Sequence, residues 1–481
     1  MQAHRRTRGR APVFPSLLTF IALGSLPVAA TEYESPSVQA AATPQAAPGV
    51  DSIARILQTR IERGGAVGIV AGIAESGTTR VSSAGYRTAG GTVPVDEETV
   101  FEIGSVSKVI TTTLLAEMVV RGEVALDDPV ARYLPDSVRM PSFEGHQITL
   151  LDLATQSSGL PRMPGNFAPA DATNPYADYG VEQLYAFLSS YTPERAPGAA
   201  FEYSNLGMGL LGHVLARRAG KPYEALVTER ILEPLGMSET RITLDAALQA
   251  RLATGHNAGL EPVPGWDLDV LEGAGAWRST MRDMLRFAAA AAAPPPNVLG
   301  EALKMALEPR AEVGAPGVRI GLAWHVIQRG DRRIVFHNGQ TGGHHAFVGI
   351  NPANGTGVVV LANSATNIDD IGIHLLDPAV PVNHPAPPRA TVAVDDAVLE
   401  SYVGKYEFAP QFHVVVTREG DALYAQATDQ PRFRLHAASP TRFFLREIEA
   451  EVEFTTDAAG AVTGMVLHQG GRASPGRRIE P

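Results

Sequence analysis

A serine and a lysine stand three residues apart in the run Ser105-Val106-Ser107-Lys108, which opens an apolar helical pattern that stops near Gly122. Residues at this spacing share one face of a helix, so the two side chains can meet. A serine hydroxyl is a weak nucleophile until a base removes its proton. A lysine can help as that base when burial or a nearby positive charge lowers its pKa. The pattern therefore predicts nucleophilic catalysis by Ser105, assisted by Lys108.

Ser105 has a second interpretation, as a residue that only caps the helix N-terminus. The same position offers free backbone N–H groups, which stabilise developing negative charge. The chain has only four lysines, and Lys108 alone has a serine three residues before it. This coincidence favours the catalytic interpretation over the capping one.

A second motif, Tyr203-Ser204-Asn205, precedes another apolar helical stretch. Tyr203 would serve as a general base or proton shuttle if nearby cations favour its phenolate. Asn205 would orient Lys108 and a substrate carbonyl through hydrogen bonds. The alternative is a buried core tyrosine followed by a helix-capping serine.

A third motif, His337-Asn338-Gly339-Gln340, follows three strand-like apolar residues. Gly339 would let a substrate backbone lie close to the strand, and His337 would present a positive or hydrogen-bonding group at the edge of the site. The backbone N–H of Gln340 would join that of Ser105 in an oxyanion hole, which usually contributes most to acyl transfer. The alternative is a hairpin turn carrying a surface histidine.

The elements that must hold these motifs alternate between strand-like and helix-like patterns from residue 51 to residue 376, which indicates an α/β or α+β domain. Clustered prolines at 377–390 predict a linker. Residues 391–481 predict a small antiparallel barrel or sandwich, because short strand-like runs alternate there with turn formers. These runs are residues 412–416, 422–426, 432–435, 442–445, 451–455 and 462–468.

The N-terminal residues 1–30 have the pattern of a secretory signal peptide, with a basic head, an apolar run and small residues before a cleavage point after Ala30. The basic residues are Arg5, Arg6, Arg8 and Arg10. The apolar run is shorter than the roughly 20 residues of a membrane span, so we expect no transmembrane anchor after cleavage. Residues 31–50 predict a flexible leader, and the mature protein is expected to be secreted or periplasmic.

The formal charge of the whole chain is −11, and it becomes −15 after loss of residues 1–30, with 36 basic and 51 acidic residues. This balance disfavours nucleic acid as a partner. The absence of cysteine excludes disulfides, thiol catalysis and thiolate metal sites. We expect no cofactor and no metal: a metallohydrolase built on His337, His344 and His345 is disfavoured because the chain has no His-Glu-x-x-His. An α/β-hydrolase is disfavoured because it has no Gly-x-Ser-x-Gly elbow.

The order Ser-x-x-Lys, Tyr-x-Asn and His-x-Gly resembles the class C β-lactamase and penicillin-binding-protein family of serine hydrolases, over about residues 51 to 376. Connecting segments resemble the family as well: residues 126–135, 150–161, 234–237 and 279–284. The resemblance implies a five-stranded antiparallel sheet flanked by helices, plus a helical subdomain, with the serine between them. Residues 399–404 and the strands after them resemble a lipocalin-like C-terminal domain.

The same resemblance assigns roles to the motif residues: attack on a carbonyl to Ser105, proton transfer to Lys108 with Tyr203, positioning to Asn205, His337 and Gly339, and the oxyanion hole to the amides of Ser105 and Gln340. It implies an acyl-enzyme that water or another acceptor releases.

One residue departs from the class C pattern, which has lysine where this chain has His337. Histidine there is more similar to D,D-carboxypeptidases, D-aminopeptidases and related esterases. A histidine is neutral over part of the physiological pH range, so it is a weaker anchor for a substrate carboxylate. An ester or D-peptide hydrolase is therefore the leading expectation, and a β-lactamase the alternative. An inert penicillin-binding or peptidoglycan-binding protein is the expectation from another class, but it would have lost a motif, and all three are present.

Overall fold

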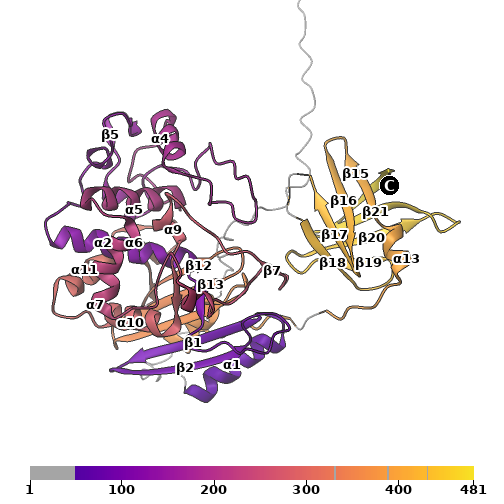
Figure 1. The fold of residues 1–481 in the computed structure, drawn as a ribbon, viewed down its shortest axis with the longest axis horizontal. Coiled ribbons are helices and arrows are strands. Elements are labelled where there is room, and N and C mark those ends of the chain that lie inside the picture. Colours follow the sequence, from indigo (N-terminus) through magenta and orange to yellow (C-terminus); the bar gives the residue numbers. More distant parts are fainter. Residues whose placement is uncertain (1–48, 330–331, 387–388, 429, 431, 481) are drawn as a thin grey trace, which may run out of the picture. The chain divides into compact units, whose positions relative to one another are not determined.

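The structure is a computed structural model that describes residues 49–329, 332–386, 389–428, 430 and 432–480 (Figure 1). The predicted signal peptide and nearly all of the predicted leader lie outside the described residues. Within these ranges, the structure contains no helix of sufficient length and apolarity to cross a membrane. A part that mixes helices and strands precedes a barrel, and each is described separately.

The centre of the mixed part is an antiparallel sheet of eight strands in the order β2-β1-β14-β13-β12-β11-β10-β9. In that order the strands are Thr78–Gly85, Gly68–Glu75, Thr356–Ala362, His345–Asn351, Arg332–Gln340, His325–Arg329, Val318–Ile320 and Ala311–Glu312. The resemblance to known proteins implied five strands. The sheet is larger because it continues beyond β12 through three shorter strands, β11, β10 and β9, which precede β12 in the chain and extend that edge.

Helices cover both faces of this sheet, because side chains alternate from face to face along each strand. On β1, Ile69 and Ile73 pack in one core with helices α1 (Val50–Glu62) and α12 (Asp369–Leu376). Val70 faces the other core, which contains helix α10 (Met281–Ala292). Figure 1 shows α1 beside β1 and β2. The mixed helix-and-sheet fold predicted from the sequence is therefore confirmed.

Several of the remaining helices of the mixed part pack against α2 (Ser107–Val120), whose first twelve residues are all buried. A helix that is apolar on all sides belongs inside a protein core. The elements that contact it are the 3-10 turn η1 (Gly104–Val106), α5 (Asn205–Ala219), α6 (Tyr223–Val227), the π-helix η3 (Thr228–Leu232), α9 (Glu272–Gly275) and α11 (Val298–Leu307). The mixed part also contains α3 (Leu150–Ala154), α4 (Val181–Ser190), α7 (Glu233–Leu235), α8 (Ala246–Gln249) and the 3-10 turn η2 (Val130–Tyr133). Two small hairpins join β4 (Ser142–Phe143) to β5 (His146–Gln147) and β6 (Gly255–His256) to β7 (Pro262–Val263).

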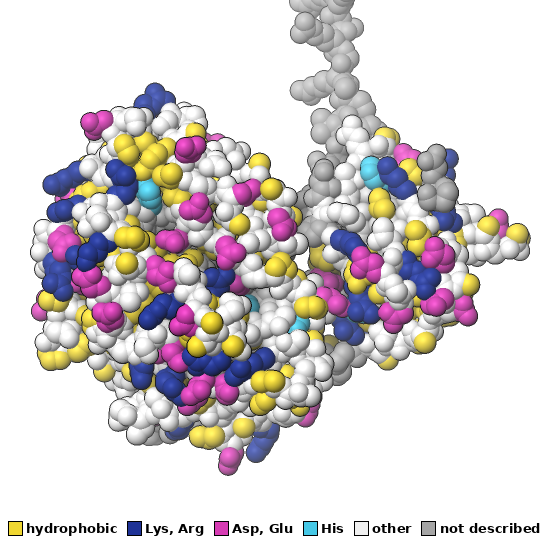
Figure 2. Space-filling view, viewed as in Figure 1, with side chains coloured by type: hydrophobic (Ala, Val, Ile, Leu, Met, Phe, Trp, Pro, Cys, Tyr) yellow, Lys and Arg dark blue, Asp and Glu magenta, His cyan; other side chains and the backbone are white. Residues whose placement is uncertain are grey.

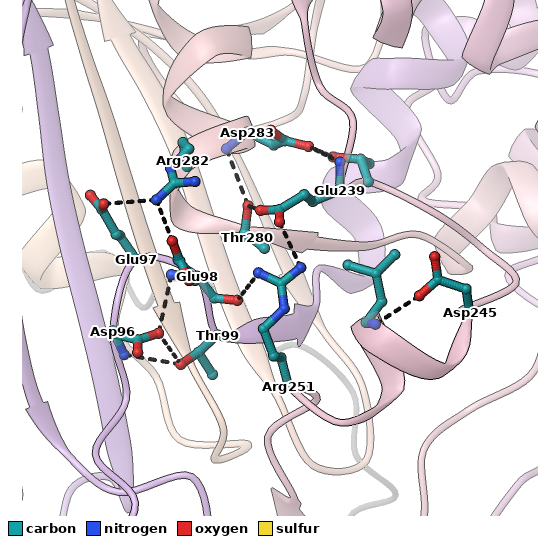
Figure 3. Close-up of polar contacts among 12 residues, drawn as sticks. Asp96, Glu97, Glu98, Thr99, Glu239, Asp245, Arg251, Thr280, Arg282 and Asp283 are labelled. Atoms are coloured by element: carbon teal, nitrogen blue, oxygen red, sulfur yellow. Dashed lines mark hydrogen bonds and ion pairs between the residues drawn. The ribbon is translucent and has the colours of Figure 1, made fainter.

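Strand β3 (Val100–Glu102) delivers the chain to Ser105, and it pairs with β8 (Arg278–Thr280). Figure 3 shows how the residues before β3 are held. Arg282 donates to Glu97 at 3.0 Å and to Glu98 at 2.7 Å, while Arg251 donates to the Glu98 carbonyl at 3.1 Å. The two exposed ion pairs of Arg282 are individually weak, but with the hydrogen bond from Arg251 they hold the entry to β3 against α10 and the segment after α8.

The C-terminal part contains a short helix α13 (Asp396–Ser401) and a closed antiparallel barrel in which each strand pairs with the next. The strands run from β15 to β22: Gly404–Ala409, Phe412–Glu419, Ala422–Ala427, Arg432–Ala437, Arg442–Phe444, Ala450–Thr456, Val462–Gln469 and Arg472–Glu480. The ring of Phe454 stacks on Tyr402 with centroids 3.9 Å apart, and Tyr406 packs edge-on against it. The predicted antiparallel barrel is confirmed, with one strand added at each end of the predicted set.

Candidate active site

Ser105 lies in the turn η1, between β3 and α2. Its hydroxyl does not cap either helical segment. Instead, Oγ of Ser105 accepts hydrogen bonds from Nζ of Lys108 at 2.8 Å and from the hydroxyl of Tyr203 at 2.6 Å. The interpretation of Ser105 as a simple cap is therefore wrong.

The side chain of Lys108 is completely buried, and its Nζ atom has three oxygen neighbours. Besides Ser105, they are Oδ1 of Asn205 at 2.9 Å and the carbonyl oxygen of Ala274 at 2.6 Å. These last two oxygens can only accept hydrogen bonds, so they hold two N–H groups of Lys108. The third tetrahedral position of Nζ then points at Ser105, and in the neutral amine that position is a lone pair ready to receive the serine proton.

The surroundings of Lys108 favour this neutral amine. Burial is the larger cause, and the positive charge of Arg162 adds to it; together they lower the pKa of Lys108 well below its ordinary value of 10.5. A buried, perturbed amine beside a serine hydroxyl is the arrangement that general-base activation requires.

Hydrogen bonds from α2 to its surroundings fix the rotation of the helix and so the position of Lys108. The Thr111 hydroxyl donates to the Gly273 carbonyl at 2.7 Å, and the Thr112 hydroxyl donates to the Leu322 carbonyl at 2.8 Å. Gly273 belongs to α9, the same short helix that presents Ala274 to Lys108. The acceptor of Lys108 is thus anchored to the helix that carries Lys108.

Tyr203 lies two residues before α5, whose N-terminus is capped by Ser204: the Ser204 hydroxyl accepts from Gly207 N at 2.8 Å. The capping serine of the alternative interpretation is therefore present, and Tyr203 still reaches Ser105. Burial raises the pKa of Tyr203 to about 12, although the hydrogen bond with Ser105 and the charge of Arg162 oppose the rise. Tyr203 is consequently a phenol that donates a proton, rather than a phenolate base.

Asn205 begins α5 and connects Lys108 to the loop before this helix. Its Oδ1 accepts from Lys108, and its Nδ2 donates to the hydroxyl of Tyr176 at 3.3 Å. The two contacts together fix which end of the amide faces the lysine. Tyr176 packs in turn against Trp266, with ring centroids 5.2 Å apart, and against Phe167 at 5.4 Å.

The backbone of η1 lies directly against the end of β12. A methyl group on Gly339 would come within 2.7 Å of Ser105 N and 2.1 Å of the Ile103 carbonyl oxygen. A methyl group on Gly104, whose φ is +47°, would come within 2.8 Å of Gln340 N. The two glycines therefore allow the amides of Ser105 and Gln340 to lie side by side, as an oxyanion hole requires.

His337 lies on β12 opposite Val348 and is buried, with 1% of its surface exposed. Its Nδ1–H donates to the carbonyl of Asn338. Burial, together with the charges of His325 and Lys108, lowers the pKa of His337 well below 6.5. The histidine is therefore neutral at physiological pH and not at the surface, contrary to the surface-histidine alternative.

Glu102, at the end of β3, is a buried carboxylate that joins three segments near Ser105. Its Oε1 accepts from Trp266 N at 3.0 Å, and its carboxylate lies within 3.4 Å of Arg278 and 3.5 Å of His344. Burial opposes its ionisation, but the contacts with His344 and Arg278 outweigh burial and lower its pKa. Glu102 thereby links β3 to the turn that follows Gln340.

The adjacent histidines after that turn diverge. His344 faces Glu102, whereas Nε2 of His345 lies 3.0 Å from Asp369. In the described ranges, no three residues of the types that bind metals are grouped as a metal site would need.

Seven residues predicted from the sequence are thus placed around one point: Ser105, Lys108, Tyr203 and Asn205 by direct hydrogen bonds, Gly339 and Gln340 by backbone approach, and His337 buried beside them. Sequence reasoning missed Ala274, Arg162 and Tyr176. Ala274 acts through its carbonyl, which leaves no trace in the sequence. Arg162 directly follows the segment 150–161, and that proximity was the available signal.

Comparison with known proteins finds similar sequences and folds over the part of the chain that contains these residues. The beta-lactamase family model matches residues 53–375. The chain is 34% identical over 224 residues to D-alanyl-D-alanine-carboxypeptidase/endopeptidase AmpH of Escherichia coli K12. That alignment covers 46% of this chain and 57% of AmpH. It is 28% identical over 333 residues to a beta-lactamase of Pseudomonas fluorescens, covering 62% of this chain and 88% of the relative.

A crystal structure of a class C beta-lactamase from Rhodobacter sphaeroides matches with a TM-score of 0.60 at 25% identity, covering 69% of this chain and 99% of that one. A second match, at residues 388–477, is to a domain of unknown function, DUF3471, and it covers the barrel except for the last three residues of β22. The first match spans most of the chain and includes every residue around Ser105. The chain therefore belongs to the beta-lactamase family.

Proposed function

We propose that this protein is a serine hydrolase that transfers an acyl group from an ester or a D-peptide-like amide to Ser105 and then to water. The observation that supports it best is the pair of hydrogen bonds on Oγ of Ser105, one from Lys108 at 2.8 Å and one from Tyr203 at 2.6 Å. The pKa of Lys108 is lowered and the pKa of Tyr203 is raised. Groups whose pKa values are driven apart are suited to act as base and acid in one reaction.

In the proposed reaction, neutral Lys108 takes the proton of Ser105 as Oγ attacks the substrate carbonyl carbon. The amides of Ser105 and Gln340 bind the oxygen that becomes negative. The bond to the leaving group breaks, and the leaving atom receives a proton from Tyr203. Lys108 then passes the proton that it took from Ser105 to the phenolate of Tyr203, and both residues return to their starting states. Water then attacks the acyl-enzyme by the same route in reverse, releasing the acid and free Ser105.

The substrate class follows from relatives and from the third motif. The names of the relatives include a D-alanyl-D-alanine carboxypeptidase/endopeptidase and beta-lactamases. The alignment with the former spans only 57% of its length, so its activity supports the proposal without defining it. His337 is neutral where the class C pattern has lysine, which favours esters and D-peptides over efficient hydrolysis of β-lactams.

Intact-mass measurements test the proposal. The purified protein is incubated with a fluorophosphonate and, separately, with a penicillin. We expect one fluorophosphonate adduct that is absent from Ser105→Ala. Either the absence of an adduct or an adduct that survives Ser105→Ala would refute the proposed nucleophile, and the absence of an adduct would favour an inert binding protein.

The penicillin sample separates the remaining alternatives. A persistent adduct would indicate a penicillin-binding enzyme, and rapid turnover without an adduct would indicate a β-lactamase. Turnover of short acyl esters or D-amino-acid amides would then identify the preferred acyl donor.

We also propose that the protein is exported, to the periplasm or outside the cell. The support is the signal-like pattern of residues 1–30. Fractionation of cells that express the whole chain, with the mass of the processed product, tests this: a product retained in the cytoplasm with residues 1–30 intact would contradict it.

A further inference from the structure

The basic side chains of Lys108 and His337 are not available to bind a negatively charged substrate group. Every hydrogen-bonding position of Lys108 Nζ is taken, by Ser105, Asn205 and the carbonyl of Ala274. His337 is buried and neutral. If the substrate carries an anionic group, another residue must bind it.

Arg162 has the free charge that these residues lack. Its side chain is exposed, and its guanidinium carbon lies 5.1 Å from the centroid of the Tyr203 ring. Across the described part of the chain, no carboxylate forms an ion pair with it. An arginine stays ionised at all relevant pH values and presents five N–H donors in a planar fork.

The backbone of Arg162 is held in place even though its side chain is exposed. Its carbonyl oxygen accepts from Asn205 N at 3.0 Å and from Leu206 N at 3.3 Å, at the start of α5. The guanidinium therefore extends from a fixed point beside the catalytic residues and lies over Tyr203 by a cation–π contact.

We propose that Arg162 binds a carboxylate on the leaving-group side of the scissile bond and thereby selects substrates that carry one. This inference rests on the proposed function, because it assumes that Tyr203 protonates the leaving atom. A carboxylate one or two bonds from that atom then falls beside the Tyr203 ring, within reach of the guanidinium above it. A guanidinium pairs with a carboxylate through two parallel hydrogen bonds, which adds direction to the attraction.

Two matched substrates isolate this contact: an N-acetyl-D-alanyl ester of D-lactic acid and the same ester of D-lactamide. Both give the same acyl-enzyme, so they differ only in the leaving-group charge. We expect wild-type kcat/KM to favour the carboxylate by about 10- to 100-fold, the range of a hydrogen bond to a charged group. In Arg162→Gln this ratio should fall to near 1.

The ratio separates substrate binding from an indirect effect of Arg162. Loss of its charge also changes the pKa of Lys108, but that change affects both substrates equally and cancels in the ratio. Arg132→Gln is the matched control, because Arg132 also lies over a tyrosine ring, that of Tyr133 at 5.8 Å, without contacting the site. We expect the control to keep the wild-type ratio.

The outcomes that would overturn the inference differ from failure of the proposed function. If the ratio of kcat/KM for the two substrates is the same in Arg162→Gln as in the wild type, Arg162 affects only the pKa of Lys108. Equal rates for the two substrates in the wild type, or no reaction with either while Ser105 still takes the fluorophosphonate, would also overturn it and leave the nucleophile intact. Absence of the fluorophosphonate adduct would instead refute the proposed function, and this inference with it.

Discussion

The side-chain nitrogen of Lys108 donates to the carbonyl oxygen of Ala274 at 2.6 Å, the shortest of its three hydrogen bonds. This contact joins Lys108, the proposed base, to α9, and α9 is itself held by Thr111 of the same helix as Lys108. The geometry of proton transfer is therefore set by a closed loop of contacts between α2 and α9, and it does not depend on the substrate.

Replacing Lys108 with methionine should stop acylation without unfolding the protein. Methionine has a similar length, suits a fully buried position and cannot accept a proton. The rate of fluorophosphonate labelling should fall by about 10²- to 10⁴-fold, the usual contribution of a general base. Stopped-time intact-mass spectra measure the rate, and a thermal melt verifies folding. A folded Lys108→Met variant that labels at the wild-type rate would exclude Lys108 as the base.

The labelling rate of the wild-type protein should rise with pH, with a midpoint below the 10.5 of an ordinary lysine. The rise follows because only neutral Lys108 accepts the serine proton, and its pKa is lowered by burial and then by Arg162. Arg162→Gln removes the second cause, so its midpoint should move to higher pH. If the wild type and Arg162→Gln have the same midpoint, the charge of Arg162 does not lower the pKa of Lys108.

Acid should destabilise the protein between about pH 6.5 and pH 4, in part through His325. Burial lowers the pKa of His325 to about 4 in the folded protein, against 6.5 ordinarily. Between these pH values, His325 binds a proton in the unfolded chain but not in the folded one. The free energy of unfolding therefore falls as pH falls, by at most about 1.4 kcal/mol per pH unit for one group.

Denaturant titrations at pH 7 and pH 5 measure this effect. His325→Phe keeps an aromatic ring beside Phe201 and Phe336 but removes the titrating group, so its stability should decrease less over the same interval. His146→Phe, which replaces an exposed histidine of β5, is the control and should keep the wild-type dependence. Equal pH dependence in all three proteins would contradict the assignment to His325.

A methyl group at Gly339 should damage the oxyanion hole. The added carbon would lie 2.7 Å from Ser105 N, so the two amides must separate. Loss of an oxyanion donor typically lowers kcat by about 10²- to 10³-fold, and we expect labelling of Gly339→Ala to slow to that extent. Gly165→Ala adds the same group in an exposed loop, where its nearest neighbour is Phe187 at 3.7 Å, and should leave the rate unchanged. Wild-type labelling by a folded Gly339→Ala would exclude this model of the hole.

Local spacing made part of the site predictable. Ser105 and Lys108 are three residues apart on a helical turn, and this relationship holds in any fold that keeps the helix. Tyr203 and Gln340 were placed by resemblance to a family, because contacts across 98 residues, as between Ser105 and Tyr203, have no local signature. The oxyanion amides followed from the same resemblance and from the glycines beside them.

Other features depended on tertiary structure. Tyr203 was considered as a phenolate base, but its pKa depends on burial, which the motif does not reveal. The motif also allows His337 to be either a positive or a hydrogen-bonding group, and burial makes it neutral. In the fold, β9 and β10 have two and three residues, too few for an alternating pattern, and β22 contains Pro475, which is untypical of a strand. Their pairing comes from the neighbouring strands.

The close approach of Gly104 and Gly339 has a consequence for how this enzyme can diversify. The groups proposed to stabilise the oxyanion are backbone amides, so side-chain substitution leaves them in place, except where one of the two glycines that let them approach is replaced. Arg162, Tyr176 and Trp266, in contrast, reach the site from loops and contribute their side chains. Mutations of these loop side chains can therefore change which substrate binds while the backbone amides of the oxyanion hole stay in place. A new substrate preference then need not slow the chemical step.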